Sequence, residues 1–404
     1  MKRLYYGWVI VGIGLLVKMV ALGFGRFAYA ILLSNMRGSL HFNYIQMGLL
    51  SGGILLGYLL FSVVGGMLAT RFGPKRIVIA SLLCSAISMF FLGQLSHFLP
   101  LLFFAFLMGA GAAGTHISMT ALPMGWFEKR QLGRALGIIQ GGTGLGIVVT
   151  GFLLPPLLIS LGETAWRDCW RLMACITFAV LIAATLLLKE KPLQWHPSPD
   201  QKADGQKPVS RVASEMSLRK ITLVYFIFGF AYNIYTTYFV AFMLEEVRLT
   251  EKSAGDIWAI FGWLSMFSGF IWGFLSDRLG REKALLWNNA IISVALLLPL
   301  CLHHTFFLAV STSLFGFTFI GTVTVVAAAI GDQAGEKRAS IYGWVTLIHG
   351  IGQFIGTTSG GYLKDLTHSF QWTLTASLIG FLLCFILIAF GKRKKGEKKF
   401  PPSL

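Results

Sequence analysis

The stretch Gly66-Met-Leu-Ala-Thr-Arg-Phe-Gly-Pro-Lys-Arg76 recurs in the second part of the chain as Gly273-Phe-Leu-Ser-Asp-Arg-Leu-Gly-Arg-Glu-Lys283. Three residues of the first copy, Gly66, Arg71 and Gly73, each reappear 207 positions later, the difference between 273 and 66. This offset is about half of the 404 residues. We therefore interpret the chain as two related halves that arose by duplication.

Apolar segments of membrane length surround both copies. The chain is 55% hydrophobic and only 13% charged, whereas a soluble domain carries roughly 25% charged residues. A helix of about 20 apolar residues crosses the hydrocarbon layer of a membrane, and a helix satisfies the backbone groups that lipid cannot. We predict twelve such spans, at residues 7–34, 45–69, 77–96, 99–125, 135–161, 169–188, 219–244, 254–276, 283–302, 305–330, 339–363 and 369–391.

Each copy of the repeat ends the second span of its half and begins the third. The sequence therefore predicts an all-α membrane protein with twelve transmembrane helices in two six-helix bundles related by pseudo-two-fold symmetry. We expect an N-terminal bundle over residues 1–190 and a C-terminal bundle over residues 218–391. The polar, proline-containing stretch 191–217 reads as a cytoplasmic linker, and residues 392–404 form a basic tail.

Positive charge is concentrated in alternate loops, which predicts the orientation of the spans. If the N-terminus is inside, the opposite side carries only Arg37, Arg167, Arg171, Arg248, Lys252 and Lys364. We therefore expect a multi-pass protein of the inner (cytoplasmic) membrane with both termini cytoplasmic. A net charge of +17 could indicate nucleic acid, but a basic run beside a last span is more typical of a topological anchor that contacts anionic lipid. We expect membrane lipid as a partner, no nucleic acid, and a monomer.

The repeated stretch resembles the signature that joins helices two and three in the major facilitator superfamily. Shorter motifs resemble its monocarboxylate and oxalate/formate transporter-like bacterial members. These motifs are Tyr5-Tyr-Gly-Trp-Val-Ile-Val11, Trp126-Phe127, and Gly141-Gly-Thr-Gly-Leu-Gly146 with Pro155-Pro156. Glycines in the last motif fit a tight helix contact as well as a hinge. The resemblance implies two bundles that rock against each other in a cycle of alternating access.

The resemblance also implies that the repeated stretch latches one conformation of that cycle. In the second copy we expect Gly273 to permit close helix approach, Asp277 to accept hydrogen bonds from a helix N-terminus, and Arg278 to form an ion pair. In the first copy Thr70 replaces the usual acid, which leaves a charged latch there in question. The alternative is that these basic residues only mark topology. The candidate latch residues are Gly66, Arg71, Gly73, Gly273, Asp277, Arg278 and Gly280.

Two cations lie inside the first predicted span, whereas all seventeen acidic residues fall in predicted loops or at helix ends. A charge in the hydrocarbon layer costs on the order of 3 kcal/mol, so Lys18 and Arg26 are expected to face a polar cavity. An interior with cations and no carboxylate suits an anionic ligand, which the planar fork of Arg26 can hold at two points. The alternatives are that Arg26 snorkels outward and that Lys18 pairs with backbone carbonyls.

Buried polar side chains in the predicted spans complete a candidate substrate site. The candidates are Arg26, Lys18, Tyr29, His116, Tyr232, Asn233, Tyr235, His349 and Gln353. Each histidine is equally compatible with plain packing. His116 and His349 are also the candidates for coupling to protons, because imidazole titrates near neutral pH.

These features predict a secondary transporter of a small organic anion, a carboxylate, with protons as a candidate coupling ion. One alternative is an exporter of amphipathic or hydrophobic compounds, which the 14% aromatic content favours. An alternative of another class is a membrane-embedded sensor or enzyme that does not transport. We expect no enzyme activity and no cofactor or metal, because no catalytic or phosphate-binding motif is present and His303-His304 is an isolated pair. The five cysteines form no paired motif.

Overall fold

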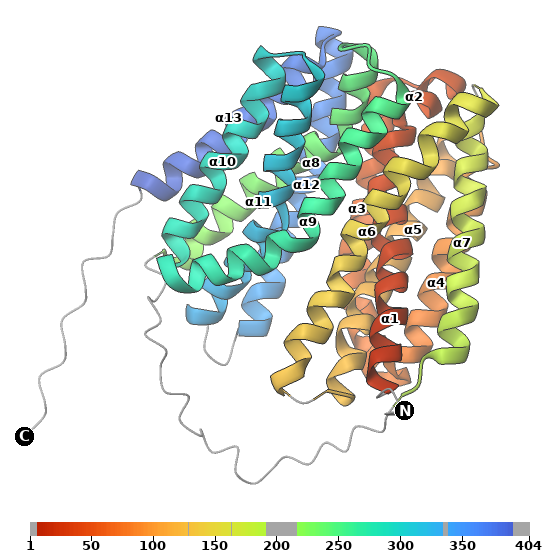
Figure 1. Cartoon of the computed structure of the whole chain (residues 1–404), viewed down its shortest axis with the longest axis vertical. Coiled ribbons are helices and arrows are strands. Elements are labelled where there is room, and N and C mark those ends of the chain that lie inside the picture. Colours follow the sequence, from red (N-terminus) through yellow and green to blue (C-terminus); the bar gives the residue numbers. More distant parts are fainter. Residues whose placement is uncertain (1–5, 128, 163, 191–215, 334–337, 391–404) are drawn as a thin grey trace, which may run out of the picture.

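The computed structural model describes residues 6–127, 129–162, 164–190, 216–333 and 338–390. The predicted tail lies outside the described residues, as does all of the predicted linker except residues 216 and 217. The described chain is helical (Figure 1). The N-terminal half contains α1 (Tyr6–Lys18), η1 (Met19–Phe27), α2 (Ala28–Leu40), α3 (Tyr44–Phe72), α4 (Pro74–Leu92), α5 (Phe98–Ala121), η2 (Leu122–Gly125), α6 (Lys129–Leu161) and α7 (Ala165–Leu187). The C-terminal half contains α8 (Leu218–Glu245), α9 (Glu251–Leu279), α10 (Arg281–Cys301), α11 (Thr305–Gln333), α12 (Arg338–Thr367) and α13 (Phe370–Phe390).

These helices confirm the predicted all-helical membrane fold. Within the described residues, eleven helices are long and apolar enough to cross a membrane, with Tyr6–Leu40 taken as one span. The twelfth, α12, is equally long but more polar. It packs against both α8 and α3, so it carries polar side chains into the interior of the molecule.

The first span is longer and less regular than the predicted helix over 7–34. Residues Met19–Phe27 form a π-helical segment, and the backbone N–H of Ala28 donates to the Gly23 carbonyl. Gly23 makes this local widening compatible with tight packing, since a Cβ there would lie 2.5 Å from the Cα of Gly146 on α6. A π-helical turn inside a helix often marks a functional position, and this one contains Arg26.

Both copies of the repeat have the same backbone geometry. Gly73 separates α3 from α4 with φ +88°, and Gly280 separates α9 from α10 with φ +89°. Glycine adopts this positive φ without the steric penalty that a Cβ would add. The structure therefore supports the duplication that the sequence indicates.

Glycines bring the two halves together at two crossings. On α6, Gly144 and Gly151 meet the backbone of α9 at Gly262 and Gly255. At the second crossing, Gly361 on α12 of the C-terminal half lies against the backbone of Tyr44 on α3 of the N-terminal half. The α6 glycine run is thus a tight helix contact between the halves, one of the two interpretations that the sequence allowed.

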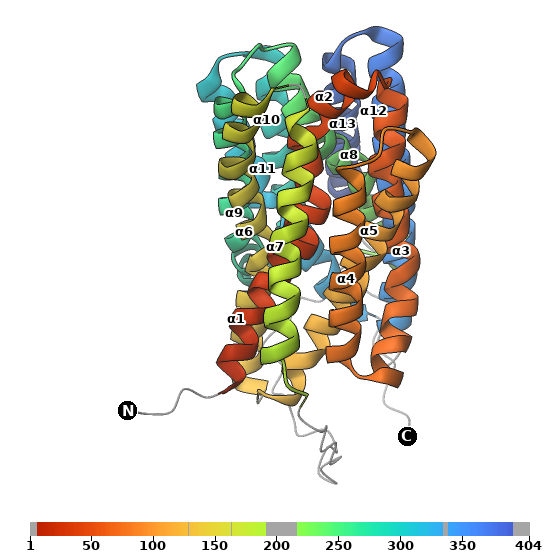
Figure 2. The same cartoon turned by 90° about the vertical axis from the view of Figure 1, so that its right-hand side faces the viewer.

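The helices of both halves run between two opposite ends of the molecule. We call the end where α3 gives way to α4 the near end, and the end where α2 gives way to α3 the far end; these are the lower and upper ends in Figure 1. The lower ends of α1 and α6 diverge from those of α9 and α11 in this view. Figure 2 shows the N-terminal half from its outer side, with α7 between α1 and α4 at the near end.

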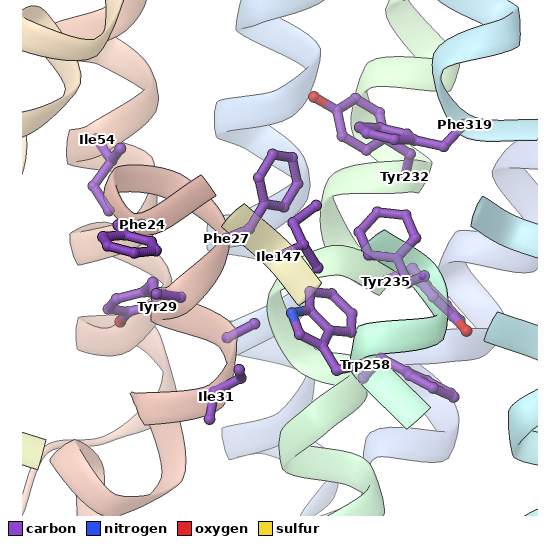
Figure 3. Packing of buried hydrophobic residues seen from close by; sticks show 14 of the residues in the cluster. Phe24, Phe27, Tyr29, Ile31, Ile54, Ile147, Tyr232, Tyr235, Trp258 and Phe319 are labelled. Carbon is purple, nitrogen blue, oxygen red and sulfur yellow. The ribbon is translucent and has the colours of Figure 1, made fainter. Parts of the chain in front are cut away.

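Aromatic side chains from both halves fill the centre between the bundles (Figure 3). The Phe27 ring lies 6.0 Å from the Phe261 ring and 5.9 Å from the Phe319 ring, measured between centroids. Tyr232 lies 5.1 Å from Phe319. This cluster forms one wall of the region around Arg26.

Candidate functional site

Arg26 joins the two halves at the centre of the molecule. Its Nη2 atom donates hydrogen bonds to the Tyr232 hydroxyl and to Gln353 Oε1, the latter at 2.8 Å. Tyr232 belongs to α8 and Gln353 to α12. Among the described residues, no carboxylate lies within 4.0 Å of the guanidinium. Arg26 is therefore a central cation held by neutral partners.

Aromatic rings surround the Arg26 guanidinium. Its carbon lies 5.5 Å from the Phe27 ring, 6.0 Å from the Tyr58 ring and 5.9 Å from the Tyr232 ring. Such cation–π contacts contribute about 0.5–2 kcal/mol each, which partly offsets the desolvation of the cation. They also confine the guanidinium plane to a defined position.

The far-end side of Arg26 is closed. A cavity of about 10 Å³ there is lined by polar side chains that include Ser51, Asn233 and Thr237. This volume holds about one water molecule. This cavity is too small for an organic anion.

Lys18 and His116 pair with each other rather than with Arg26. The Lys18 Nζ atom lies 2.6 Å from His116 Nδ1 and also donates to the His116 carbonyl oxygen at 3.3 Å. Lys18 is fully buried and His116 is half-buried. One of the predicted alternatives for Lys18, a backbone carbonyl partner, thus occurs together with a side-chain partner.

Tyr58 lies between this pair and Arg26. Its ring centroid is 6.1 Å from the His116 ring, in an edge-on arrangement, and 6.0 Å from the Arg26 guanidinium carbon. The two cations of the first span therefore belong to neighbouring parts of one polar region. Tyr58 was not among the predicted site residues, because a tyrosine in an apolar helix gives no sign of which face it occupies.

Asn233 and His349 flank the partners of Arg26. Asn233 donates to the Gln353 carbonyl at 3.4 Å. His349 donates from Nδ1 to the Tyr225 carbonyl at 2.8 Å, and its ring is stacked 5.7 Å from the Tyr232 ring. This backbone bond fixes a proton on Nδ1, so only Nε2 of His349 is available for exchange in this conformation.

The hydroxyl groups of Tyr29 and Tyr235 bond to partners other than Arg26, although Tyr29 also lines the small cavity beside Arg26. Tyr29 donates to the Met47 carbonyl at 2.7 Å, which ties α2 to α3. The Tyr235 hydroxyl lies 3.0 Å from Ser311 Oγ on α11, and its ring stacks on Phe315. In this conformation both residues pack the bundles. Tyr29 is three positions from Arg26 and Tyr235 belongs to the polar cluster of the 219–244 span, but the sequence could not show the direction of either side chain.

The second copy of the repeat, in the C-terminal half, contains an ion-pair network around Arg281. Arg281 donates to Asp277 at 2.6 Å and to Asp332 of α11 at 3.0 Å. Asp277 thus accepts from Arg281 in this conformation rather than from a helix N-terminus, and Arg278 lies over the Phe274 ring at 4.2 Å rather than in an ion pair.

The glycines of the repeat leave ordinary space at this end. A Cβ on Gly273 would lie 3.5 Å from Thr324, and one on Gly66 would lie 4.0 Å from Ile117. These distances are normal van der Waals contacts, so the expected close helix approach at Gly273 is absent here.

Glu190 supplies the carboxylate that the first copy of the repeat lacks. Thr70 donates to the Gly66 carbonyl of its own helix at 2.9 Å. Glu190, which follows α7, accepts the backbone N–H of Lys75 at 2.8 Å in the first turn of α4. A carboxylate is favoured at a helix N-terminus. This contact could not be predicted, because its two residues are 115 positions apart in the chain.

The far end carries charged contacts between the halves. Both oxygens of Asp365 on α12 accept backbone N–H groups of α3, from Tyr44 at 2.9 Å and from Ile45 at 2.8 Å. Glu245 of α8 accepts the Tyr44 hydroxyl and lies 3.7 Å from Arg37 of α2. These groups hold the far end closed. Outside them a cavity of about 620 Å³ opens to the surface, lined by both basic and acidic residues.

Residues 18–389 match the family model described as the uncharacterised MFS-type transporter YbfB. The chain belongs to this family of MFS-type transporters. The match spans both halves and includes every residue of the site described above. The resemblance to the major facilitator superfamily is thereby confirmed, and the protein is a multi-pass membrane transporter rather than an enzyme.

Named relatives extend over most of the chain. The chain is 25% identical to the hexuronate transporter of Bacillus subtilis (strain 168), over 81% of each chain. It is 24% identical to the probable nitrate/nitrite antiporter NarK1 of Thermus thermophilus, over 85% of this chain and 81% of that protein. It is also 25% identical to monocarboxylate transporter 13 of Bos taurus, over 79% of this chain and 72% of the relative.

Solved structures confirm the fold. A bacterial homolog of the human lysosomal transporter Spinster, in an inward-facing and unoccupied conformation, superimposes with a TM-score of 0.77 at 17% identity. The alignment covers 96% of this chain and 97% of that one. At this identity the likeness establishes the arrangement of the helices.

Proposed function

We propose that this transporter carries a small organic anion, a carboxylate, across the cytoplasmic membrane, and that Arg26 binds the negative group. The observation that carries the proposal is the position of Arg26, a central cation whose described partners are neutral. A cation inside the hydrocarbon layer costs roughly 3 kcal/mol. A carboxylate that arrives from the near-end side offsets this cost through charge-assisted hydrogen bonds.

The geometry of Arg26 connects anion binding to the contact between the halves. A carboxylate that binds a guanidinium with both oxygens uses either the Nη1–Nη2 edge or the Nε–Nη2 edge. Both edges include Nη2, which already donates to Tyr232 and to Gln353. Among the described residues, Nε and Nη1 donate to none. A two-point grip therefore displaces one of the two C-terminal partners and changes the link between the bundles.

The relatives support an anionic substrate. Hexuronate and monocarboxylates are carboxylates, and nitrate is a planar anion of similar charge. Arginine suits planar, bidentate recognition of such groups better than lysine does.

The proposed cycle is alternating access. In this conformation the far end is closed by Asp365 and Glu245, and the near end diverges. Opening the far end requires these contacts to break and the near end to close. The concentration of positive charge in alternate loops favours a cytoplasmic position for the near end, both termini and the linker. The conformation would then face inward.

A ligand screen on the purified protein tests the proposal. We expect thermal stabilisation by at least one small anion from a panel of L-lactate, D-glucuronate, L-tartrate, sulfoacetate and nitrate, and none by lipophilic cations. Because binding to the folded state alone raises stability, a shift reports affinity. Stabilisation by lipophilic cations only would favour the exporter of amphipathic compounds, which the aromatic wall of Phe27, Phe261 and Phe319 could accommodate. That outcome would contradict an anion site.

A further inference from the structure

The pairing of Lys18 with His116 has no role in holding Arg26. The two nitrogen atoms are 2.6 Å apart, so one of them donates a hydrogen bond to the other. An ammonium group on Lys18 can donate to an unprotonated Nδ1, which leaves the His116 proton on Nε2. A protonated Nδ1 can instead donate to a neutral amine. The contact excludes an ammonium facing an imidazolium, because both nitrogens would then be donors.

Within the described part of the chain, the surroundings of the pair contain no compensating carboxylate. On the elements that pack around Lys18, the titratable groups at this depth are His116 of α5, Tyr58 of α3 and Arg26 of η1. The facing wall on α6 is backbone, since a Cβ on Gly142 would lie 2.9 Å from the Lys18 Cβ. Asp168 of α7 and the other acidic residues of the described helices lie toward helix ends. A positive charge on the pair therefore has no fixed counter-ion.

We propose that Lys18 and His116 form a single-proton site, and that its occupancy is coupled to the anion bound at Arg26. The pair holds one exchangeable proton and alternates between a charge of +1 and a charge of zero. The proton enters through the half-buried imidazole and resides on the fully buried amine. This inference rests on the proposed function only for the coupling, and the proton site itself does not depend on the identity of the substrate.

Tyr58 places the two sites next to each other. It contacts the His116 ring at 6.1 Å and the Arg26 guanidinium at 6.0 Å. In a medium of low dielectric constant, an anion at Arg26 stabilises a proton on the neighbouring pair, and by linkage the proton strengthens anion binding by the same factor. A monoanion would thus be carried together with one proton, and the loaded site would gain no net charge.

Proton counting on the purified full-length protein tests the site without a ligand. Potentiometric titration between pH 5 and pH 9 should show that the double variant Lys18→Gln/His116→Gln takes up one proton fewer than wild type. Gln131→Asn is the control, because it changes an exposed side chain that carries no titratable proton. It should match wild type. A difference of zero or of two protons would overturn the shared site.

Histidine nitrogen NMR distinguishes a shared proton from an independent imidazole. With 15N-labelled histidine, the resonance that disappears in His116→Gln should never show the imidazolium shift between pH 5 and pH 9. Appearance of the imidazolium form at His116 would overturn the residence of the proton on the Lys18 amine, because the imidazole would then hold it. The single variant also serves to check folding by its thermal transition.

The coupling is tested separately with the anions themselves. Adding L-lactate, D-glucuronate or nitrate to lightly buffered protein should cause uptake of one proton per bound anion in wild type, seen with a pH indicator dye. The double variant should bind with no proton uptake. Binding without proton uptake in wild type would overturn the coupling. If none of these anions binds, the proposed function fails, while the titration still decides whether the proton site exists.

Discussion

Asp365→Asn should weaken the closure of the far end. In the structure both carboxylate oxygens accept backbone N–H groups of α3, from Tyr44 at 2.9 Å and Ile45 at 2.8 Å. An asparagine keeps one acceptor oxygen and loses the charge. A capping interaction is worth about 1 kcal/mol and a charge at a helix N-terminus about 0.3–1 kcal/mol. We therefore expect the far-end-closed state to lose about 1.5 kcal/mol, roughly a tenfold change in the population ratio.

Spin-label distances across the far end measure this change. Labels at positions 97 and 303, which are exposed at the far ends of the two halves, report the separation of the halves by double electron–electron resonance. Asp365→Asn should increase the fraction of long distances. Asp256→Asn is the matched control, because Asp256 lies near the far end of α9 and none of the described contacts involves it. An unchanged distance distribution in folded Asp365→Asn would refute the role of Asp365 in closure.

Three further predictions concern the latch, the packing and the topology. Asp277→Asn removes one of the two carboxylates that pair with Arg281 at the near end. It should slow transport in proteoliposomes, while substrate affinity changes by no more than a few-fold. A large loss of affinity at an unchanged transport rate would contradict the latch. Gly146→Ala should lower the free energy of unfolding by about 1–3 kcal/mol, because its Cβ would lie 2.4 Å from the Met19 carbonyl oxygen. Gly137→Ala on the same helix, with open space around the Cβ, should be neutral in the same thermal measurement, and equal losses would mean that the crossing is not tight. A cysteine at position 200 should resist an impermeant reagent added outside intact cells, and its labelling would reverse the proposed topology.

The sequence predicted the fold because its signals are local and repeated. Apolar runs fixed the existence of the helices, and Gly73 and Gly280 showed where two of them are joined. The structure moved only the ends, as for α3, which runs from Tyr44 to Phe72 instead of 45–69. The π-helical turn of η1 could not be predicted in this way, since it accompanies the contact of Gly23 with Gly146 on another helix.

The candidate site was predictable as a charge imbalance but not as a geometry. Arg26 and Lys18 are visible in sequence as cations within an apolar span. Their partners depend on packing between residues far apart in the chain, which is why the link from Arg26 to Gln353, 327 positions away, was not expected. The directions of Tyr29 and Tyr235, and the place of Tyr58, likewise follow from the rotation of each helix in the bundle.

The affinity of the anion identified by the thermal screen for Arg26→Gln tests the central claim most directly. Glutamine keeps polarity and removes the charge, and two charge-assisted hydrogen bonds contribute about 1.5–3 kcal/mol each. We expect calorimetry on the purified protein to show affinity at least ~100-fold below wild type, with Arg26→Lys also impaired. Arg219→Gln, an exposed arginine at the near end of α8, should bind as wild type does. Wild-type affinity in folded Arg26→Gln, or a substrate that is a cation, would contradict the account.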